Sequence, residues 1–127
     1  MARTRIFIVD DDPVFVKLME HELAGYSYRT YNSGEACLAD IHRKPRYVLL
    51  DFSLGGLNGL DTLKRILQKS PGSKVIILTA LNDPEVKEKC LAAGAYDYIV
   101  KDPDGLEQLR KKHWPQVKRK GLFGWLG

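Results

Sequence analysis

The chain has 127 residues, of which 44% are hydrophobic and 28% are charged, a mixture that predicts one globular domain rather than a disordered chain. It contains no apolar run near the ~20 residues that span a bilayer and no recognisable secretion signal. Its two cysteines lack the spacing of a disulfide scaffold or a zinc site. We therefore expect a cytoplasmic protein. The net charge of +4 belongs to residues 111–127, which hold five Lys or Arg and no acid, whereas residues 1–110 hold 15 basic and 16 acidic side chains, so nucleic-acid binding is not expected of the domain itself.

Apolar segments rich in β-branched residues alternate along the chain with segments of helical periodicity. Such apolar runs are typical of strands buried on both faces of a sheet, and Asp-Pro pairs and glycines mark the starts and ends of helices. The predicted elements are strand 5–9, helix 12–25, strand 26–31, helix 33–42, strand 46–50, helix 60–67, strand 74–78, helix 83–94, strand 96–100 and helix 104–113. This alternation predicts an α/β fold with a five-stranded, mostly parallel sheet and helices on both faces.

The first predicted helix has a clear start and an apolar stripe. Asp12 stands before a proline and is interpreted as the helix N-cap. Val14, Leu18, Met19 and Leu23 recur at helical spacing, so we expect them to form the buried face.

Polar residues follow four of the predicted strands directly. Asp10 and Asp11 follow the first strand, Asp51 the third, Thr79 the fourth and Lys101 the fifth. In open parallel sheets ligands bind at the carboxyl ends of the strands, so these side chains are expected to meet. Three carboxylates at one edge repel one another and stay ionised only beside a cation. With Lys101 the group carries −2, which one Mg²⁺ would neutralise, and Mg²⁺ prefers oxygen ligands.

The same residues suit phosphoryl transfer. A carboxylate such as Asp51 can attack phosphorus and form an aspartyl phosphate. The transferring group then needs its charge balanced by a metal ion, an ammonium and hydrogen-bond donors. Lys101 offers the ammonium, Thr79 a hydroxyl, and the backbone N–H of Ala80 a further donor.

Four motifs, each at a predicted strand end, carry a family resemblance over about residues 4–113. They are Ile6-Phe-Ile-Val-Asp-Asp-Asp-Pro13, Val48-Leu-Leu-Asp51 with Leu57-Asn-Gly59, Val75-Ile-Ile-Leu-Thr-Ala80, and Gly94-Ala-Tyr-Asp-Tyr-Ile-Val-Lys101. In this order the sequence resembles a receiver domain of bacterial two-component response regulators, the family of the chemotaxis regulator. The resemblance implies a doubly wound (βα)5, flavodoxin-like receiver fold spanning residues 1–113.

The resemblance also implies roles for the acidic residues. Asp51 would be the phosphoacceptor, which receives the phosphoryl group from a sensor histidine kinase or a phosphotransfer protein. Asp10, Asp11 and Asp51 would bind Mg²⁺ together with the backbone carbonyl of Ser53. The domain would be a signalling switch and not an enzyme in the ordinary sense, since it would catalyse only its own phosphorylation and dephosphorylation.

For the remaining residues the resemblance implies phosphate binding and signal output. Thr79 and Lys101 would bind phosphoryl oxygens, and Tyr98 would be an aromatic switch that turns inward as Thr79 moves toward the phosphate. Output would pass to a downstream target or output domain through the face made by helix 83–94, strand 96–100 and helix 104–113. Homodimerisation on phosphorylation is a further option for the output. For Tyr98 itself, the role of an ordinary buried core tyrosine is equally open.

Two positions depart from the family pattern. Gly55 stands where relatives usually have proline, so the loop from Phe52 to Gly59 is expected to be more mobile. Asp102 stands where proline usually follows the lysine. Because a cis bond without proline costs ~2.5–4 kcal/mol, we expect the bond between Lys101 and Asp102 to be trans.

Two other classes of protein on the same scaffold remain as rivals. A phosphatase with an aspartyl phosphate generally needs a second acid two residues after the nucleophile, where this chain has Ser53. A flavodoxin-like cofactor binder needs a phosphate-binding first loop, where three consecutive aspartates would repel a phosphate. Cys37 and Cys90 are expected to be small packing residues in helices.

Residues 114–127 are predicted to be a basic, aromatic tail or the start of a linker. An alternative is that the chain is the N-terminal receiver fragment of a multidomain regulator, with an output domain such as a DNA-binding module absent from it. A membrane or nucleic-acid contact of Lys118-Arg-Lys-Gly-Leu-Phe-Gly-Trp-Leu126 is a weaker alternative.

Overall fold

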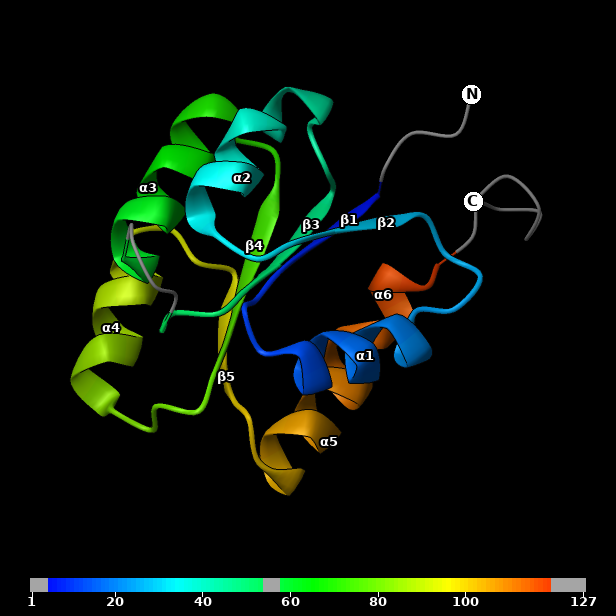
Figure 1. Cartoon of the computed structure of the whole chain (residues 1–127). Helices are drawn as coiled ribbons and strands as arrows, with labels where there is room; N and C mark the ends of the chain where they lie inside the picture. The colour runs from blue at the N-terminus through cyan, green and yellow to red at the C-terminus, as the bar shows by residue number, and fades with distance from the viewer. Residues whose placement is uncertain (1–4, 54–57, 120–127) are drawn as a thin grey trace.

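The computed structural model describes residues 5–53 and 58–119. Its centre is a five-stranded sheet in the order β2-β1-β3-β4-β5, and every neighbouring pair of strands is parallel (Figure 1). The strands are β1 (Ile6–Val9), β2 (Tyr28–Tyr31), β3 (Tyr47–Leu50), β4 (Lys74–Thr79) and β5 (Asp97–Val100). The predicted α/β fold with a parallel sheet is confirmed, and strand order reverses after β1, as in doubly wound sheets.

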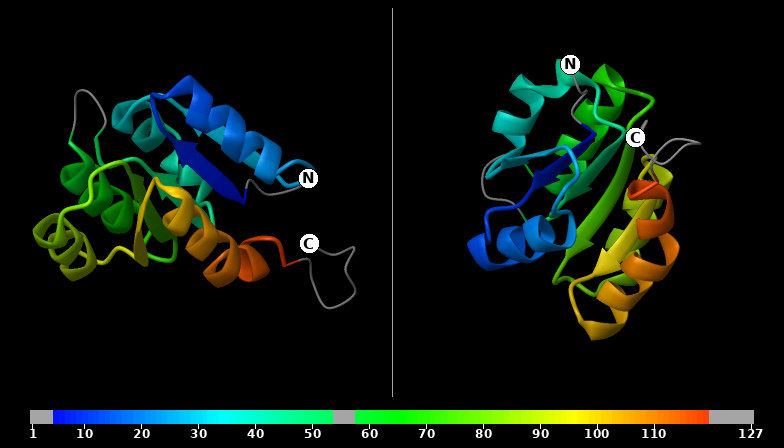
Figure 2. Two further views of the ribbon diagram at one scale, coloured as in Figure 1. Left: turned by 90° about the horizontal axis from the view of Figure 1, so that it is seen from below. Right: turned by 90° about the vertical axis from the view of Figure 1, so that its right-hand side faces the viewer.

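Helices cover both faces of this sheet (Figures 1 and 2). One face packs against α1, α5 and α6, and the other against α2, α3 and α4. The helices are α1 (Pro13–Glu22), α2 (Gly34–Ala39), the 3₁₀ helix η1 (Ile41–Arg43), α3 (Gly59–Lys69), α4 (Pro84–Ala92), α5 (Pro103–Lys112) and α6 (Trp114–Val117). Among the described residues, no helix is both long enough and apolar enough to cross a bilayer.

The central strands are apolar throughout because both of their faces are covered. All four residues of β1 and all four of β3 are buried, and alternate residues enter the two core clusters. Strand β2 lies at the edge of the sheet, and its burial is correspondingly weaker.

Cys37 and Cys90 are buried free thiols, and burial raises the pKa of both. Their burial is what we expect of small packing residues.

Three helices begin at an aspartate followed by proline. The carboxylates of Asp12, Asp83 and Asp102 each accept a hydrogen bond from a backbone N–H of the first turn. Asp102 therefore has a local role in starting α5, and its peptide bond with Lys101 is trans, as predicted. The chain leaves β5 through Lys101 and enters α5 immediately, which fixes the position of Lys101 at the end of the sheet.

The buried face of α1 differs from the predicted stripe. Phe15 and Met19 are the buried residues of this helix, whereas the side chain of Val14 is 76% exposed. Phe15, Met19 and Leu23, spaced four residues apart, share the face that packs against the sheet, and Val14 lies outside it. The prediction for Val14 was wrong, and Phe15 takes its place beside the carboxyl edge of the sheet.

The fold continues beyond the predicted end of the domain at residue 113. Helix α6 carries Trp114 and Val117, which are buried with the residues of α1 and α5, and Trp114 Nε1 donates a hydrogen bond of 3.3 Å to Glu22 Oε1. The packed structure thus reaches Val117. Residues 120–127 of the predicted tail, and residues 54–57 of the predicted mobile loop, lie outside the described residues.

Candidate functional site

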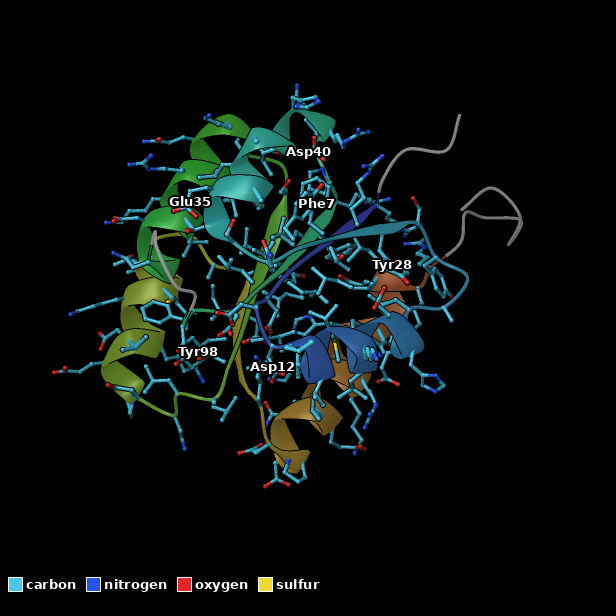
Figure 3. All side chains as sticks on the ribbon, in the orientation of Figure 1. Phe7, Asp12, Tyr28, Glu35, Asp40 and Tyr98 are labelled. Carbon is cyan, nitrogen blue, oxygen red and sulfur yellow. The ribbon has the colours of Figure 1, made fainter. Side chains whose placement is uncertain are left out.

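Four strands deliver polar residues to one edge of the sheet. Asp10 follows β1, Asp51 follows β3, Thr79 ends β4 and Lys101 follows β5. Because the strands are parallel and adjacent, their carboxyl ends meet there. Figure 3 shows the two flanks of this edge, with Asp12 at the start of α1 and Tyr98 on the side of α4. The predicted meeting of these strand ends is therefore present in the fold.

Three carboxylates form a cluster at this edge. Asp10, Asp11 and Asp51 each offer one oxygen, and these oxygens lie within 4.8 Å of one another. Asp10 and Asp51 are buried and Asp11 is exposed. Carboxylates this close repel each other, and burial makes their charge more costly.

Lys101 supplies the cation inside this cluster. Its Nζ lies 2.7 Å from Asp10 Oδ2 and 3.3 Å from Asp51 Oδ2, and its side chain is 12% exposed. Burial raises the pKa of Asp10 above its ordinary value, although hydrogen bonds from Lys101 and from the Asp12 N–H oppose that rise. Lys101 is thus the cation that faces both buried carboxylates.

The remaining oxygen of Asp51 is bound by the turn that follows it. The Ser53 N–H donates to Asp51 Oδ1 at 3.0 Å. The Ser53 hydroxyl in turn lies 3.5 Å from Thr79 Oγ1, which accepts a hydrogen bond from the Leu81 N–H at 3.2 Å. The two oxygens of Asp51 therefore face different partners, one on a backbone N–H and one on an ammonium.

Tyr98 lies inside the fold next to this edge. It is 4% exposed, and burial raises the pKa of its hydroxyl to about 12, with smaller contributions from Cys90 and Asp83. Its hydroxyl donates to the backbone carbonyl of Leu81 at 2.5 Å. The ring is therefore buried, which fits both interpretations of Tyr98, the aromatic switch and the core tyrosine.

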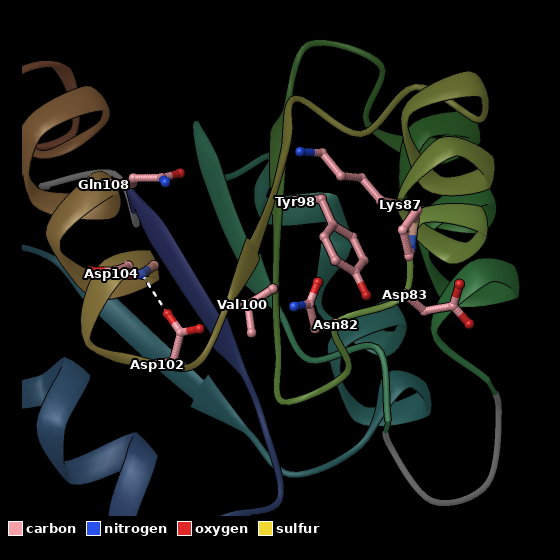
Figure 4. Close-up of a pocket in the computed structure, with 10 residues that line it drawn as sticks. Asn82, Asp83, Lys87, Tyr98, Val100, Asp102, Asp104 and Gln108 are labelled. Carbon is pink, nitrogen blue, oxygen red and sulfur yellow. Dashed lines mark hydrogen bonds between the residues drawn. The ribbon is translucent and has the colours of Figure 1, made fainter.

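A groove of about 340 Å³ opens above Tyr98, between α4 and α5 (Figure 4). Asn82, Asp83 and Lys87 line it from the side of α4, and Asp102, Asp104 and Gln108 from the side of α5. The groove lies on the face that the sequence predicts for signal output. Tyr98 connects the floor of this groove to the loop after Thr79.

The acidic cluster fits a magnesium ion by the chemistry of its donors. All three side chains offer carboxylate oxygens, the ligands that Mg²⁺ prefers, and one of them is exposed so that water can complete the coordination. Two of these carboxylates are buried and face a single ammonium, that of Lys101. A divalent cation at this place would balance the remaining negative charge.

The structure brings together the side chains predicted from the strand ends, and it adds one that the sequence analysis missed. The ring centroid of Phe15 lies 4.2 Å from Lys101 Nζ. The signal that could have found Phe15 was its spacing of four residues from Met19 on the same helix. Its contact with Lys101 joins segments far apart in the sequence and has no local signature.

Sheet order and the acidic edge together define a receiver-type signalling domain. The model of the response regulator receiver domain family matches residues 6–113. The chain belongs to this family, and it is a response-regulator receiver domain of the two-component type.

Individual relatives agree with this family. The probable transcriptional regulatory protein TcrX of Mycobacterium tuberculosis is 31% identical over 120 residues, which are 92% of this chain and 51% of TcrX. A cyclic di-GMP phosphodiesterase of Thermotoga maritima is 33% identical over 109 residues, 84% of this chain and 29% of that protein. The chain spans about half or less of the length of these relatives.

Solved structures show the same fold. The BeF3-activated DrrB receiver domain is 31% identical with a TM-score of 0.77, covering 87% of this chain and 94% of that one. A CheY-like receiver domain protein of Methanospirillum hungatei is 28% identical with a TM-score of 0.77, covering 92% and 98%. A CheX-CheY-BeF3-Mg complex of Borrelia burgdorferi is 25% identical with a TM-score of 0.74, covering 84% of each chain.

Proposed function

We propose that this receiver domain is a phosphorylation-controlled switch in which Asp51 accepts a phosphoryl group from a sensor histidine kinase or a phosphotransfer protein. The observation that carries the proposal is the position of the Lys101 ammonium between Asp10 and Asp51, in a cluster of three carboxylates. Asp51 follows a fully buried strand, so its carboxylate is held in place by the core.

The transfer proceeds by attack of an Asp51 oxygen on phosphorus. A bond from that oxygen to phosphorus forms, the bond from phosphorus to the donor histidine nitrogen breaks, and the electron pair stays with the imidazole. Lys101, already 3.3 Å from Asp51 Oδ2, and the hydroxyl of Thr79 bind the phosphoryl oxygens as their charge changes.

Mg²⁺ is the proposed cofactor. Asp10, Asp11, Asp51 and the backbone carbonyl of Ser53 would hold it. When bound, the ion balances the charge of the carboxylates and of the phosphoryl group. Support comes from the donor set of this chain and from the magnesium named in the related CheX-CheY complex.

The output of the switch is proposed to leave through α4, β5 and α5. Tyr98 and the groove above it lie on this face, and the hydrogen bond from Tyr98 to Leu81 connects it with the loop after Thr79. The partner would be a downstream target, an output domain or, as an alternative, a second copy after phosphorylation. A cytoplasmic location fits a kinase partner. The domain itself would bind no nucleic acid. It would catalyse only its own phosphorylation and dephosphorylation.

A multidomain parent protein is the second candidate. The chain covers 51% of TcrX and 23% of the DNA-binding transcriptional regulator NtrC of Salmonella typhimurium, so these relatives have further domains. Residues after Val117 would then be a tail or the start of the linker to an output domain.

Labelling with acetyl phosphate and Mg²⁺, followed by mapping of the modified residue, tests the phosphoacceptor. We expect Asp51→Asn to abolish labelling, whereas the control Asp104→Asn, an exposed acid in the first turn of α5, labels normally. Undiminished labelling of Asp51→Asn at another residue would overturn the proposal.

A further inference from the structure

Phe15 is the aromatic neighbour of the buried cation. Its ring centroid is 4.2 Å from Lys101 Nζ, well within the range of a cation–π contact. The residue is 7% exposed and comes from α1, across the site from β5. The ammonium therefore has an aromatic ring on one side and carboxylates on the others.

The hydrogen bonds of Lys101 leave room for this contact. An ammonium has three N–H donors, and two of them are used by Asp10 Oδ2 and Asp51 Oδ2. With little water at a side chain that is 12% exposed, the third direction is served by the ring. The negative face of an aromatic ring attracts a cation without fixing it to one acceptor atom.

This arrangement matters for the transfer step. During phosphorylation Lys101 has to exchange its contact with Asp51 Oδ2 for one with a phosphoryl oxygen. A third strong hydrogen-bond acceptor would hold the ammonium back, and an aliphatic side chain would not attract it. A ring face keeps the ammonium close and leaves it free to turn.

We propose that Phe15 is a positioning residue for Lys101: its ring face holds the ammonium between Asp10 and Asp51 and thereby raises the rate of phosphoryl transfer to Asp51. This rests on the proposed role of Lys101 in the transfer. It adds a residue of α1 to the site.

The competing explanation is that Phe15 only fills the core. It belongs to the apolar cluster on its face of the sheet, together with Met19 and Leu23. Truncation would therefore lower stability as well, so the test has to change the ring's electrons while keeping its shape. Fluorination of the ring does this, because each fluorine weakens the negative face with little change in volume.

The experiment places 4-fluoro-, 3,5-difluoro- and 3,4,5-trifluorophenylalanine at position 15 and measures the rate of labelling by acetyl phosphate with saturating Mg²⁺. We expect the rate to fall stepwise, by about tenfold for the trifluoro ring, while the urea midpoint stays constant. Phe15→Tyr, which keeps the ring face, should retain the rate.

Two controls locate the effect. Phe7 is buried on the other face of the sheet, where its ring contacts Tyr31, so fluorination there should leave the rate unchanged. In Lys101→Gln, which lacks the cation, fluorination of Phe15 should have no further effect. A separate readout is the upfield NMR shift that the ring imposes on the Lys101 ε-methylene, which should vanish in Phe15→Leu.

A constant rate across the fluorinated series, or the same decline in Lys101→Gln, would overturn the positioning role. That result differs from failure of the proposed function. If labelling maps to a residue other than Asp51, the phosphoacceptor is wrong, whereas a constant rate with label still on Asp51 refutes only the role of Phe15.

Discussion

The hydroxyl of Tyr98 donates a 2.5 Å hydrogen bond to the backbone carbonyl of Leu81. The N–H of the same Leu81 donates to Thr79 Oγ1 at 3.2 Å. One residue therefore links the hydroxyl at the end of β4 with the aromatic ring below the groove between α4 and α5. A movement of Thr79 toward a phosphoryl group would act on Tyr98 through this single peptide segment.

Tyr98→Phe tests this link, because it removes the hydroxyl and keeps the ring. We expect a loss of about 1 kcal/mol in the free energy of unfolding, since the Leu81 carbonyl loses its partner. Beryllofluoride should also cause smaller NMR shifts in α4 than in the unmodified protein. The control is Tyr96→Phe, a 45% exposed tyrosine on the same segment. Equal shifts in Tyr98→Phe and the unmodified protein would argue against the link.

Asp11→Ala tests the magnesium site. Because Asp11 is exposed, its removal should leave the fold intact while taking one carboxylate from the cluster. We expect Mg²⁺ affinity to fall by about tenfold or more, which is ~1.4 kcal/mol, and EDTA to stop labelling of the unmodified protein. Titration with Mg²⁺ measures the affinity, and the acetyl phosphate assay measures the labelling. The matched control is Asp12→Asn, because Asp12 is a neighbouring acid that caps α1. Equal affinities in Asp11→Ala and the unmodified protein would refute the ligand role.

The lifetime of the phosphorylated state is predicted to be long. In the family, the residues two after the phosphoacceptor and two after the threonine influence hydrolysis, and here they are Ser53 and Leu81. Neither offers a carboxylate or an amide to orient an attacking water. Leu81→Glu, alone or with Ser53→Asn, should therefore accelerate phosphate release from purified phosphoprotein. Decay of the unmodified protein as fast as that of the double variant would disprove the effect of these side chains.

Gly105→Ala should weaken the junction between β5 and α5. A Cβ at this position would overlap the carbonyl of Val100, so either the strand end or the helix must shift. We expect a loss of about 1–3 kcal/mol in the free energy of unfolding. Gly72→Ala is the matched control, because a Cβ there meets nothing within 4 Å. Urea unfolding measures both, and equal midpoints would contradict the prediction.

The contact of His113 with Asp97 predicts a loss of stability in acid. His113 Nε2 lies 2.6 Å from Asp97 Oδ2. Burial raises the pKa of Asp97, but the hydrogen bonds from His113 and the Tyr98 N–H outweigh it, so the pKa is lowered overall. A carboxylate whose pKa is lowered by folding stabilises the folded state at pH values above its ordinary pKa near 4. This stabilisation is lost progressively as the pH falls below 4, toward the lowered pKa.

Asp97→Asn is the test of that prediction. We expect the variant to be less stable at pH 7 and to lose less free energy of unfolding between pH 4 and pH 2. Urea unfolding at several pH values gives the slope. The same slope in the variant and the unmodified protein would show that another group controls acid unfolding.

Much of the fold could be predicted because the signals are local. Buried strands such as β1 and β3 are uniformly apolar, and the Asp-Pro pairs at Asp12 and Asp83 start helices where expected. The parallel sheet then brings the strand-end residues together without any further information. A family of known topology adds the strand order, which composition alone does not give.

The parts that the sequence did not predict depend on packing over long distances. Helix α6 is four residues long, too short for a periodic pattern, and its place is set by the burial of Trp114 and Val117. Phe15, not Val14, is buried with Met19 and Leu23 in the core cluster on this face of the sheet. Helix α6 has no periodic signature. Phe15 and Met19 share the four-residue spacing of Val14 and Leu18, so only packing decides between the two pairs.

Strand β5 has a different partner at each of its ends. Asp97, at its beginning, binds His113, which joins α5 to α6. Lys101, just after its last residue, binds the carboxylates of the acidic edge. The strand between them is four residues long, about 13 Å. Both ends of the described chain lie at the Asp97 end of the sheet, where Arg5 donates to the carbonyl of Gln116. A fluorophore attached at Arg5 or Gln116 would therefore lie at the edge of the sheet opposite the acidic cluster.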